Sequence, residues 1–172
     1  MVIKKIGVIG AGQMGHGIAL VSAKAGFEVV LRDITKEYVE KGISKIGKFL
    51  TKSIEKGKMK EDEKKKILSR INGTTNISDM KDADIVIEAI FENVKVKKEL
   101  FKELDDVCKK DCILASNTST IPITDLASAT KRSERFIGMH FMNPVPIMKL
   151  VEVIRGLRTN AVSYTHLRAH ET

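Results

Sequence analysis

A histidine and a glutamate in the C-terminal quarter of the chain have the residue types of a general base and its partner. His140 follows the apolar run that includes Met139, and Glu152 lies inside the next apolar run, between Val151 and Val153. Burying an ionised carboxylate without a partner is costly, and His140 is the nearby titratable group that could compensate Glu152. An imidazole oriented by a carboxylate can accept a proton near neutral pH. The alternative is an edge strand in which Glu152 faces water.

A glycine-rich turn near the N-terminus has the spacing that holds the phosphates of a dinucleotide. It lies between an apolar strand, residues 3–9, and a helical pattern that extends to residue 26. Such a turn directs backbone amides and a helix N-terminus toward a pyrophosphate. The first glycine permits the tight turn, the second lets the backbone approach the phosphates, and the third brings the helix close to the strand. The residues of the turn are Gly10, Ala11, Gly12, Gln13, Met14 and Gly15.

A second strand, residues 27–31, ends at Arg32 and Asp33, roughly 20 positions after the first glycine, as the dinucleotide pattern requires. Asp33 is expected to accept hydrogen bonds from the adenosine ribose. Its carboxylate would repel a 2′-phosphate, which favours NAD over NADP, although the adjacent Arg32 weakens that preference. A glycine-rich turn without any ligand is the alternative interpretation.

Strands and helices alternate along the rest of the chain, which predicts an α/β fold with a Rossmann-like, doubly wound and mostly parallel sheet. Further strands are expected at residues 84–88, 112–115 and 135–139. The polar residues 116–120 follow one of them, at the sheet edge where open α/β folds bind ligands. Ser119 could therefore hydrogen-bond a reacting oxygen, while capping of the next helix is the alternative. His140 reaches the same edge, and the chain turns there at Asn143.

Composition points to a cytoplasmic protein. The 172 residues suit one domain of ordinary size, and neither a membrane-spanning apolar run nor a secretion signal is expected. Cys108 and Cys112 are the two cysteines, and without clustered histidines they predict reduced packing thiols and no metal site.

The net charge of +8 is concentrated between Lys36 and Lys66, where eleven lysines stand against six acidic residues. The spacing of apolar residues and lysines in part of this segment predicts a helix with one apolar face and a stripe of lysines. We interpret the stripe either as an ordinary solvated surface or as an attraction for a phosphate-bearing anionic substrate. Nucleic acid is disfavoured as a partner, because no aromatic residues alternate with the basic ones. The stripe comprises Lys41, Lys45, Lys48, Lys52 and Lys56.

Five segments together resemble the NAD-binding domain of the 3-hydroxyacyl-CoA dehydrogenases, above all the bacterial members that act on 3-hydroxybutyryl-CoA. They are GAGQMG, VVLRD, IVIEAIFENVKVKKELF, ILASNTST and GMHFMNPVPIMKLVEVI, and the likeness extends from about Lys4 to about Arg158. It implies NAD as cofactor and an acyl-CoA substrate. The implied reaction is oxidation of 3-hydroxyacyl-CoA to 3-oxoacyl-CoA, or the reverse reduction, for example of acetoacetyl-CoA.

The resemblance also implies roles for individual residues. His140 corresponds to the catalytic base and Glu152 to its partner, while Ser119 lies against the substrate oxygen and the cofactor. Asn143 helps to hold the nicotinamide side and shares the catalytic site with them. The lysine-rich helices resemble the part of the family that meets coenzyme A, without assigning any single lysine. The further residues implied to contact NAD are Glu92 and Lys97.

Members of this family continue into a second, largely helical domain that covers the active site and forms a dimer interface. We therefore expect residues 1–160 to be an NAD-binding domain without its helical C-terminal partner. Residues 161–172 are expected to be an unrelated, disordered tail. The alternative function is a truncated, inactive NAD-binding module, or a structural member of the crystallin type.

Overall fold

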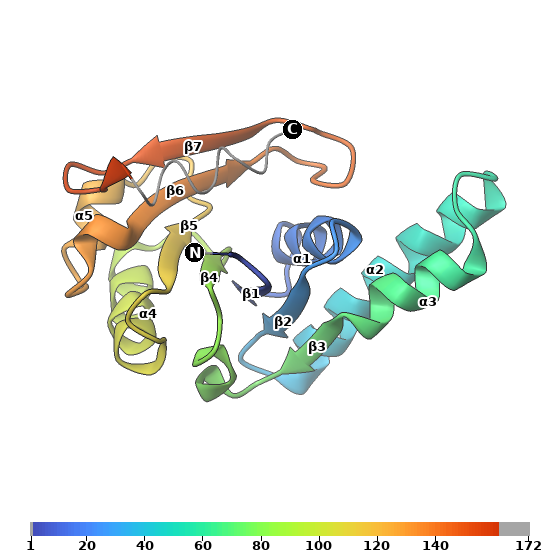
Figure 1. Ribbon diagram of the computed structural model, residues 1–172, viewed down its shortest axis with the longest axis horizontal. Helices are drawn as coiled ribbons and strands as arrows, with labels where there is room; N and C mark the ends of the chain where they lie inside the picture. The colour runs from blue at the N-terminus through green and yellow to red at the C-terminus, as the bar shows by residue number, and fades with distance from the viewer. Residues whose placement is uncertain (1, 162–172) are drawn as a thin grey trace.

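A computed structural model of the chain describes residues 2–161 and shows a seven-stranded sheet with helices on both faces (Figure 1). The expected tail, apart from residue 161, lies outside the described residues. The strands are β1 Lys5–Ile9, β2 Glu28–Arg32, β3 Ile71–Thr74, β4 Ile85–Glu88, β5 Ile113–Ser116, β6 Phe136–Phe141 and β7 Val151–Arg155. The helices are α1 Gly15–Lys24, α2 Lys36–Glu55, α3 Glu61–Ser69, α4 Val94–Val107 and α5 Ile123–Ala127, with short 3-10 turns η1 Ile77–Met80 and η2 Ser133–Arg135.

The strand order is β3-β2-β1-β4-β5-β6-β7. The first six strands are parallel, and β7 alone pairs antiparallel, against β6. The order of the strands reverses direction between β1 and β4, which is the switch point where doubly wound sheets bind ligands. This topology confirms the predicted Rossmann-like fold.

Successive residues of the central strands point to opposite faces and fill two separate cores. In β4, Ile85 and Ile87 pack with residues of α1, α2 and α3, whereas Val86 packs with residues of α4 and α5. Figure 1 shows the corresponding layers, with α1, α2 and α3 on one side of the sheet and α4 and α5 on the other. Strands buried on both faces need continuous apolar sequence, which explains the apolar runs.

Asp84 joins the start of β4 to neighbouring segments. Its carboxylate accepts hydrogen bonds from the backbone amides of Lys4 (2.7 Å) and Lys5 (2.9 Å) and from Lys109 Nζ (2.5 Å). Burial by itself would raise the pKa of Asp84, but the hydrogen bonds from Lys109 and the two amides outweigh it. The pKa of Asp84 therefore lies below its usual value.

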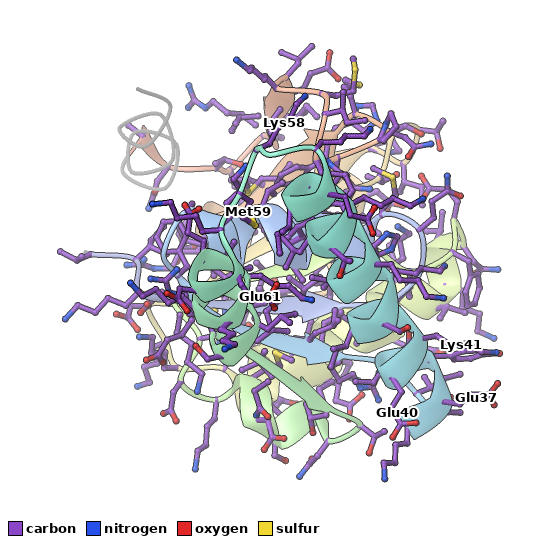
Figure 2. The ribbon with its side chains drawn as sticks, turned by 90° about the vertical axis from the view of Figure 1, so that its right-hand side faces the viewer. Glu37, Glu40, Lys41, Lys58, Met59 and Glu61 are labelled. Atoms are coloured by element: carbon purple, nitrogen blue, oxygen red, sulfur yellow. The ribbon has the colours of Figure 1, made fainter. Side chains whose placement is uncertain are left out.

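Helices α2 and α3 form a hairpin that projects from the sheet (Figure 1). The predicted apolar face of α2 is confirmed, because Ile46 and Leu50 are fully buried. All five lysines of the stripe are exposed. At the start of α2, Lys41 Nζ lies 2.6 Å from Glu37 Oε1, and Figure 2 shows this pair on the outer side of the hairpin. At least one lysine of the stripe is therefore already partnered.

Two further observations concern membrane-spanning helices and the cysteines. Among residues 2–161, no helix is both long and apolar enough to cross a bilayer. Cys108 and Cys112 are buried and free, as predicted for packing thiols.

Candidate functional site

The glycine turn between β1 and α1 is shaped by close backbone contacts. Gly10 has a φ of +98°, and a Cβ there would lie 2.7 Å from the carbonyl oxygen of Ala89. A Cβ on Gly15 would lie only 1.6 Å from the carbonyl oxygen of Gly10. Only glycine fits these two positions without moving the backbone. Around Gly12, in contrast, nothing lies within 4 Å of a Cβ, so this side of the turn is open to a ligand.

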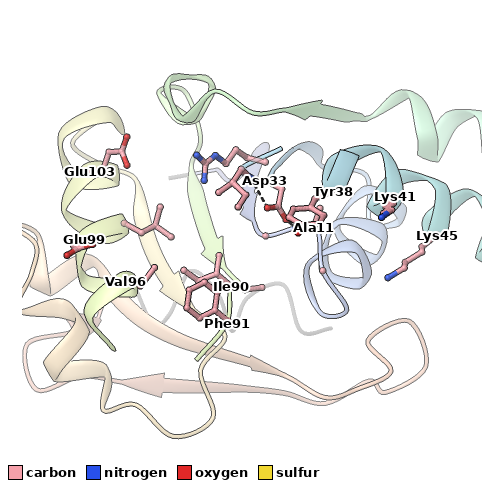
Figure 3. Close-up of a pocket in the computed structure, with 16 residues that line it drawn as sticks. Ala11, Asp33, Tyr38, Lys41, Lys45, Ile90, Phe91, Val96, Glu99 and Glu103 are labelled. Carbon is pink, nitrogen blue, oxygen red and sulfur yellow. Dashed lines mark hydrogen bonds between the residues drawn. The ribbon is translucent and has the colours of Figure 1, made fainter. Parts of the chain in front are cut away.

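Asp33 fastens the turn to the end of β2. Its Oδ2 accepts a hydrogen bond from the Ala11 amide (2.6 Å), and its Oδ1 accepts one from the Ile34 amide (2.7 Å). Figure 3 shows the Ala11 contact among the residues that line a cavity. The neighbouring Arg32 donates from Nε to the carbonyl oxygen of Thr75 (3.3 Å), which ties part of its guanidinium to the chain after β3.

That cavity has a volume of about 670 Å³ and lies between the glycine turn, α2 and α4. Tyr38 and Lys41 border it from α2, and Val96 and Glu103 border it from α4 (Figure 3). Its lining combines apolar side chains with several charged ones, which suits an aromatic base and a ribose.

A second cavity, of about 340 Å³, lies at the carboxyl ends of β4, β5 and β6. It shares Ala89 and Ile90 with the first cavity, so the two adjoin at the switch point. An extended dinucleotide can therefore cross from one to the other. Gln13 is exposed and borders neither cavity. The predicted site residues that line the second cavity are Met14, Glu92, Lys97, Ser119, His140 and Asn143.

The structure brings His140 and Glu152 into contact, with 2.7 Å between His140 Nδ1 and Glu152 Oε2. The two residues face each other directly in the antiparallel register of β6 and β7, where opposed side chains are neighbours. The expectation that Glu152 is buried is wrong, since 51% of its side chain is exposed on the edge strand. The pair forms because of strand register rather than burial. The contact at Nδ1 leaves Nε2 of His140 as the second ring nitrogen available for proton transfer.

A buried ion cluster lies below the second cavity, and the sequence indicated only two of its three residues, Glu92 and Lys97. Lys97 Nζ lies 2.8 Å from Glu88 Oε1 and 2.9 Å from Glu92 Oε2. The side chains of Glu88 and Lys97 are 0% and 1% exposed, and that of Glu92 is 40% exposed. A glutamate at the end of an otherwise apolar strand, with a lysine nine positions later, is the signal that could have indicated Glu88.

Hydrogen bonds join this cluster to the two loops that follow β4 and β5. Glu88 accepts from the Ile90 amide (2.8 Å) and from Ser116 Oγ (2.6 Å). Glu92 accepts from the hydroxyls of Thr118 and Thr120. Burial alone would raise the pKa of Glu92, but the hydrogen bonds from Thr118 and Lys97 outweigh it, and the pKa lies below its usual value.

In the loop after β5, one side chain stabilises the loop itself and another borders the second cavity. Thr118 Oγ1 accepts hydrogen bonds from the amides of Thr120 (3.3 Å) and Ile121 (3.0 Å), so it organises the approach to α5. Ser119 borders the cavity, and within residues 2–161 its hydroxyl has no protein partner. Ser119 is thus available to a ligand. The alternative that this polar stretch caps the next helix is wrong, because α5 begins after Pro122 without a side-chain cap and the Thr118 hydroxyl binds amides of the preceding loop.

Asn117 also borders the second cavity and supports the strand that carries the histidine. Its side-chain Oδ1 accepts a hydrogen bond from the backbone amide of Phe141 (2.9 Å), and the backbone amide of Asn117 donates to the carbonyl oxygen of Glu88 (2.8 Å). The paired residues of β5 and β6 end at Ser116 and Gly138, so this side chain continues the connection beyond the ladder. The end of β6 is therefore held on both sides next to His140.

Comparison with known proteins gives consistent matches. The sequence matches the family described as "3-hydroxyacyl-CoA dehydrogenase, NAD binding domain" over residues 5–170. It is 54% identical to a probable 3-hydroxybutyryl-CoA dehydrogenase of Bacillus subtilis, over 93% of this chain and 56% of the relative. It is 48% identical to the fatty acid oxidation complex subunit alpha of Psychrobacter arcticus, over 92% of this chain and 22% of the relative.

Solved structures agree with the sequence matches. The crystal structure of (S)-3-hydroxybutyryl-CoA dehydrogenase from Ralstonia eutropha superposes with a TM-score of 0.97 at 45% identity. The match covers 99% of this chain and 60% of that one. The chain thus spans little more than half the length of these dehydrogenase relatives.

Proposed function

The chain belongs to the 3-hydroxyacyl-CoA dehydrogenase family, whose cofactor is NAD, and from this premise we propose how its residues serve the family's reaction. The proposed reaction of the whole protein is oxidation of a 3-hydroxyacyl-CoA to the 3-oxoacyl-CoA, or the reverse reduction. The names of the relatives support 3-hydroxybutyryl-CoA and acetoacetyl-CoA as the substrate pair.

The dinucleotide is proposed to lie across both cavities. The adenosine would occupy the larger one, with its ribose hydroxyls at Asp33, and the pyrophosphate would rest on the open side of the turn at Gly12. The support is geometric, because a ligand can approach the backbone at Gly12 while the two flanking glycines fix the turn. The nicotinamide would then enter the smaller cavity, where Asn143 and Glu92 border it.

In oxidation, His140 is proposed to accept the substrate hydroxyl proton at Nε2, while Glu152 holds the ring through Nδ1 and stabilises the resulting imidazolium. Ser119 is proposed to hydrogen-bond the same substrate oxygen. Bound NAD supplies the acceptor for the hydride that leaves C3, so that the C–O bond becomes a carbonyl. The observation that carries this assignment is the 2.7 Å contact between His140 and Glu152 at a cavity that Ser119 and Asn143 also line.

The lysine stripe is proposed to attract the phosphates of coenzyme A, because all five of its lysines are exposed on the projecting hairpin. No single lysine of the stripe is assigned to a phosphate. We also propose that the whole protein dimerises through the region of its relatives that this chain does not span.

The test is a pair of measurements on the purified chain and its His140→Ala variant. Oxidation of NADH with acetoacetyl-CoA is followed by absorbance, and NAD binding is followed by calorimetry. His140→Ala should lower turnover by about 10² to 10⁴, the usual contribution of a positioned base, and leave NAD affinity within about twofold. Equal losses of turnover and of NAD affinity would contradict the assigned role.

Glu152→Gln provides a graded variant, because it removes the charge and keeps an oxygen that can accept from Nδ1. Its turnover should fall less than that of His140→Ala. Glu40→Gln, an exposed carboxylate on α2, is the matched control and should leave turnover unchanged.

A second candidate function is an NAD-binding module, because the glycine turn, Asp33 and the larger cavity concern the dinucleotide alone. Binding of NAD without any turnover of acetoacetyl-CoA would support this second function for the isolated chain.

A further inference from the structure

The ion cluster beneath the smaller cavity contains more negative than positive charge. Lys97 supplies one ammonium group, and Glu88 and Glu92 supply two carboxylates that both bind it. Lys97 and Glu92 border the cavity, whereas Glu88 lies behind them with no exposed surface. With all three groups ionised, one wall of the cavity carries an excess of one negative charge.

The surroundings stabilise this excess without cancelling it. The other groups that bind the two carboxylates are the Ile90 amide and the hydroxyls of Ser116, Thr118 and Thr120, which are neutral. The next lysine on α4, Lys98, is held 2.5 Å from Asp125 Oδ1. His140, which also borders the cavity, is already paired with a carboxylate of its own. The described residues thus supply the cluster with dipoles rather than with a second cation.

We propose that this cluster sets the relative affinity of the site for the two redox states of the cofactor, with Glu88 acting through Lys97 to favour the oxidised form. The nicotinamide ring carries a positive charge in NAD⁺ and none in NADH. Because Glu88 and Lys97 are buried and Glu92 is partly exposed, the negative charge of this wall is only partly screened. It therefore stabilises the cationic ring and leaves the neutral one nearly unaffected. The inference rests on the proposed function, which puts the nicotinamide in this cavity.

The proposal has a consequence for the direction of the reaction. A site that binds NAD⁺ more tightly than NADH makes the bound reduced cofactor a stronger hydride donor, because hydride loss forms the cation that the site stabilises. Glu88 is therefore a positioning residue with an electrostatic role. It cannot touch the cofactor, since it is fully buried behind Lys97.

The test is Glu88→Gln, with separate calorimetric Kd values for NAD⁺ and NADH at one pH. The replacement has nearly the same shape. Its amide oxygen can accept from Lys97 Nζ and the Ile90 amide, and its amide nitrogen can donate to Ser116 Oγ. We expect the ratio of the NADH Kd to the NAD⁺ Kd to fall by about three- to tenfold, the size of effect that one charge exerts across a partly screened protein site.

Glu40→Gln removes the same charge from the exposed side of α2, where Glu40 Oε1 lies 3.6 Å from Lys36 Nζ. It should leave the ratio unchanged, and it controls for net charge. An unchanged ratio in a folded Glu88→Gln chain would overturn the proposal. Equal weakening of both cofactor forms would also overturn it, because that result indicates a distorted site.

If Glu88→Gln does not fold, as judged by circular dichroism, Glu92→Gln decides the question. Its side chain is 40% exposed, so the change is tolerated more easily, and the ratio should fall in the same direction. An unchanged ratio in Glu92→Gln would reject the proposal. Failure of the unaltered chain to bind either cofactor form would instead reject the proposed function, so the two failures are distinguishable.

Discussion

Replacement of Lys97 by methionine should strongly destabilise the chain. Methionine can fill the space of the lysine stem, so the main loss is the ammonium group that binds Glu88 and Glu92. Glu92 is 40% exposed and can be hydrated, but Glu88 has no exposed surface. The variant therefore leaves one carboxylate buried with only neutral hydrogen-bond donors.

The expected size follows from this burial. Breaking a buried ion pair by removing one partner costs about 3–5 kcal/mol of unfolding free energy, because the remaining charge stays desolvated. The double variant Lys97→Met with Glu88→Gln removes that charge as well. It should recover about 2 kcal/mol or more relative to Lys97→Met alone, which is the coupling that a double-mutant cycle measures.

The assay is urea unfolding followed by circular dichroism, with linear extrapolation to water. Lys36→Met, which removes the exposed partner of Glu40 on α2, is the matched control and should show no measurable change. A Lys97→Met chain whose unfolding free energy lies within about 1 kcal/mol of that of the unaltered chain would contradict this prediction, because the charge of Glu88 would then not be isolated from water. Additive effects in the double variant would refute the coupling.

Three further predictions concern the cofactor turn and acid stability. Gly12→Ala should fold normally, since its Cβ meets nothing within 4 Å, but its NAD affinity, measured by calorimetry, should fall by about tenfold or more. In Gly15→Ala the Cβ would lie 1.6 Å from a backbone oxygen, so this variant should also have a lower melting temperature. Asp33→Ser should reduce the preference for NAD over NADP by about tenfold in competitive binding, because it removes the charge that repels a 2′-phosphate; an unchanged preference would show that another residue excludes NADP. The lowered pKa of Asp84 means that its contribution to stability is complete above about pH 4, the unfolded value, and is lost as pH falls through the folded pKa. Acid unfolding monitored by fluorescence-detected dye binding should therefore be less steep in Asp84→Asn, and an identical pH profile would argue against this contribution.

Much of the fold was predictable because local patterns determine it. The glycine turn requires glycine at positions where the backbone passes within contact distance, so Gly10 and Gly15 can be recognised from sequence alone. The apolar runs follow from strands buried on both faces. The order of the strands, with its switch between β1 and β4, is the usual outcome of such alternation.

The site was predictable only in part, because most of its contacts join residues of different strands and helices. His140 and Glu152 do meet, but burial of Glu152 was the wrong reason, since register in an antiparallel pair depends on the intervening loop and is invisible in the spacing. The contact of Lys97 with the cofactor stays a prediction, whereas the two carboxylates that bind its Nζ were not indicated by the sequence. The link from Glu88 to Lys97 crosses from a strand end to a helix, and no periodicity reports such a contact.

A crystal structure of the chain grown with NAD⁺ would show where each part of the cofactor lies. We predict the pyrophosphate on the open side of Gly12, the adenosine ribose at Asp33, and the nicotinamide in the smaller cavity with its reactive face toward His140. A dinucleotide bound elsewhere, or a nicotinamide that lies outside the cavity of His140 and Lys97, would contradict both the catalytic assignment and the proposed role of the ion cluster.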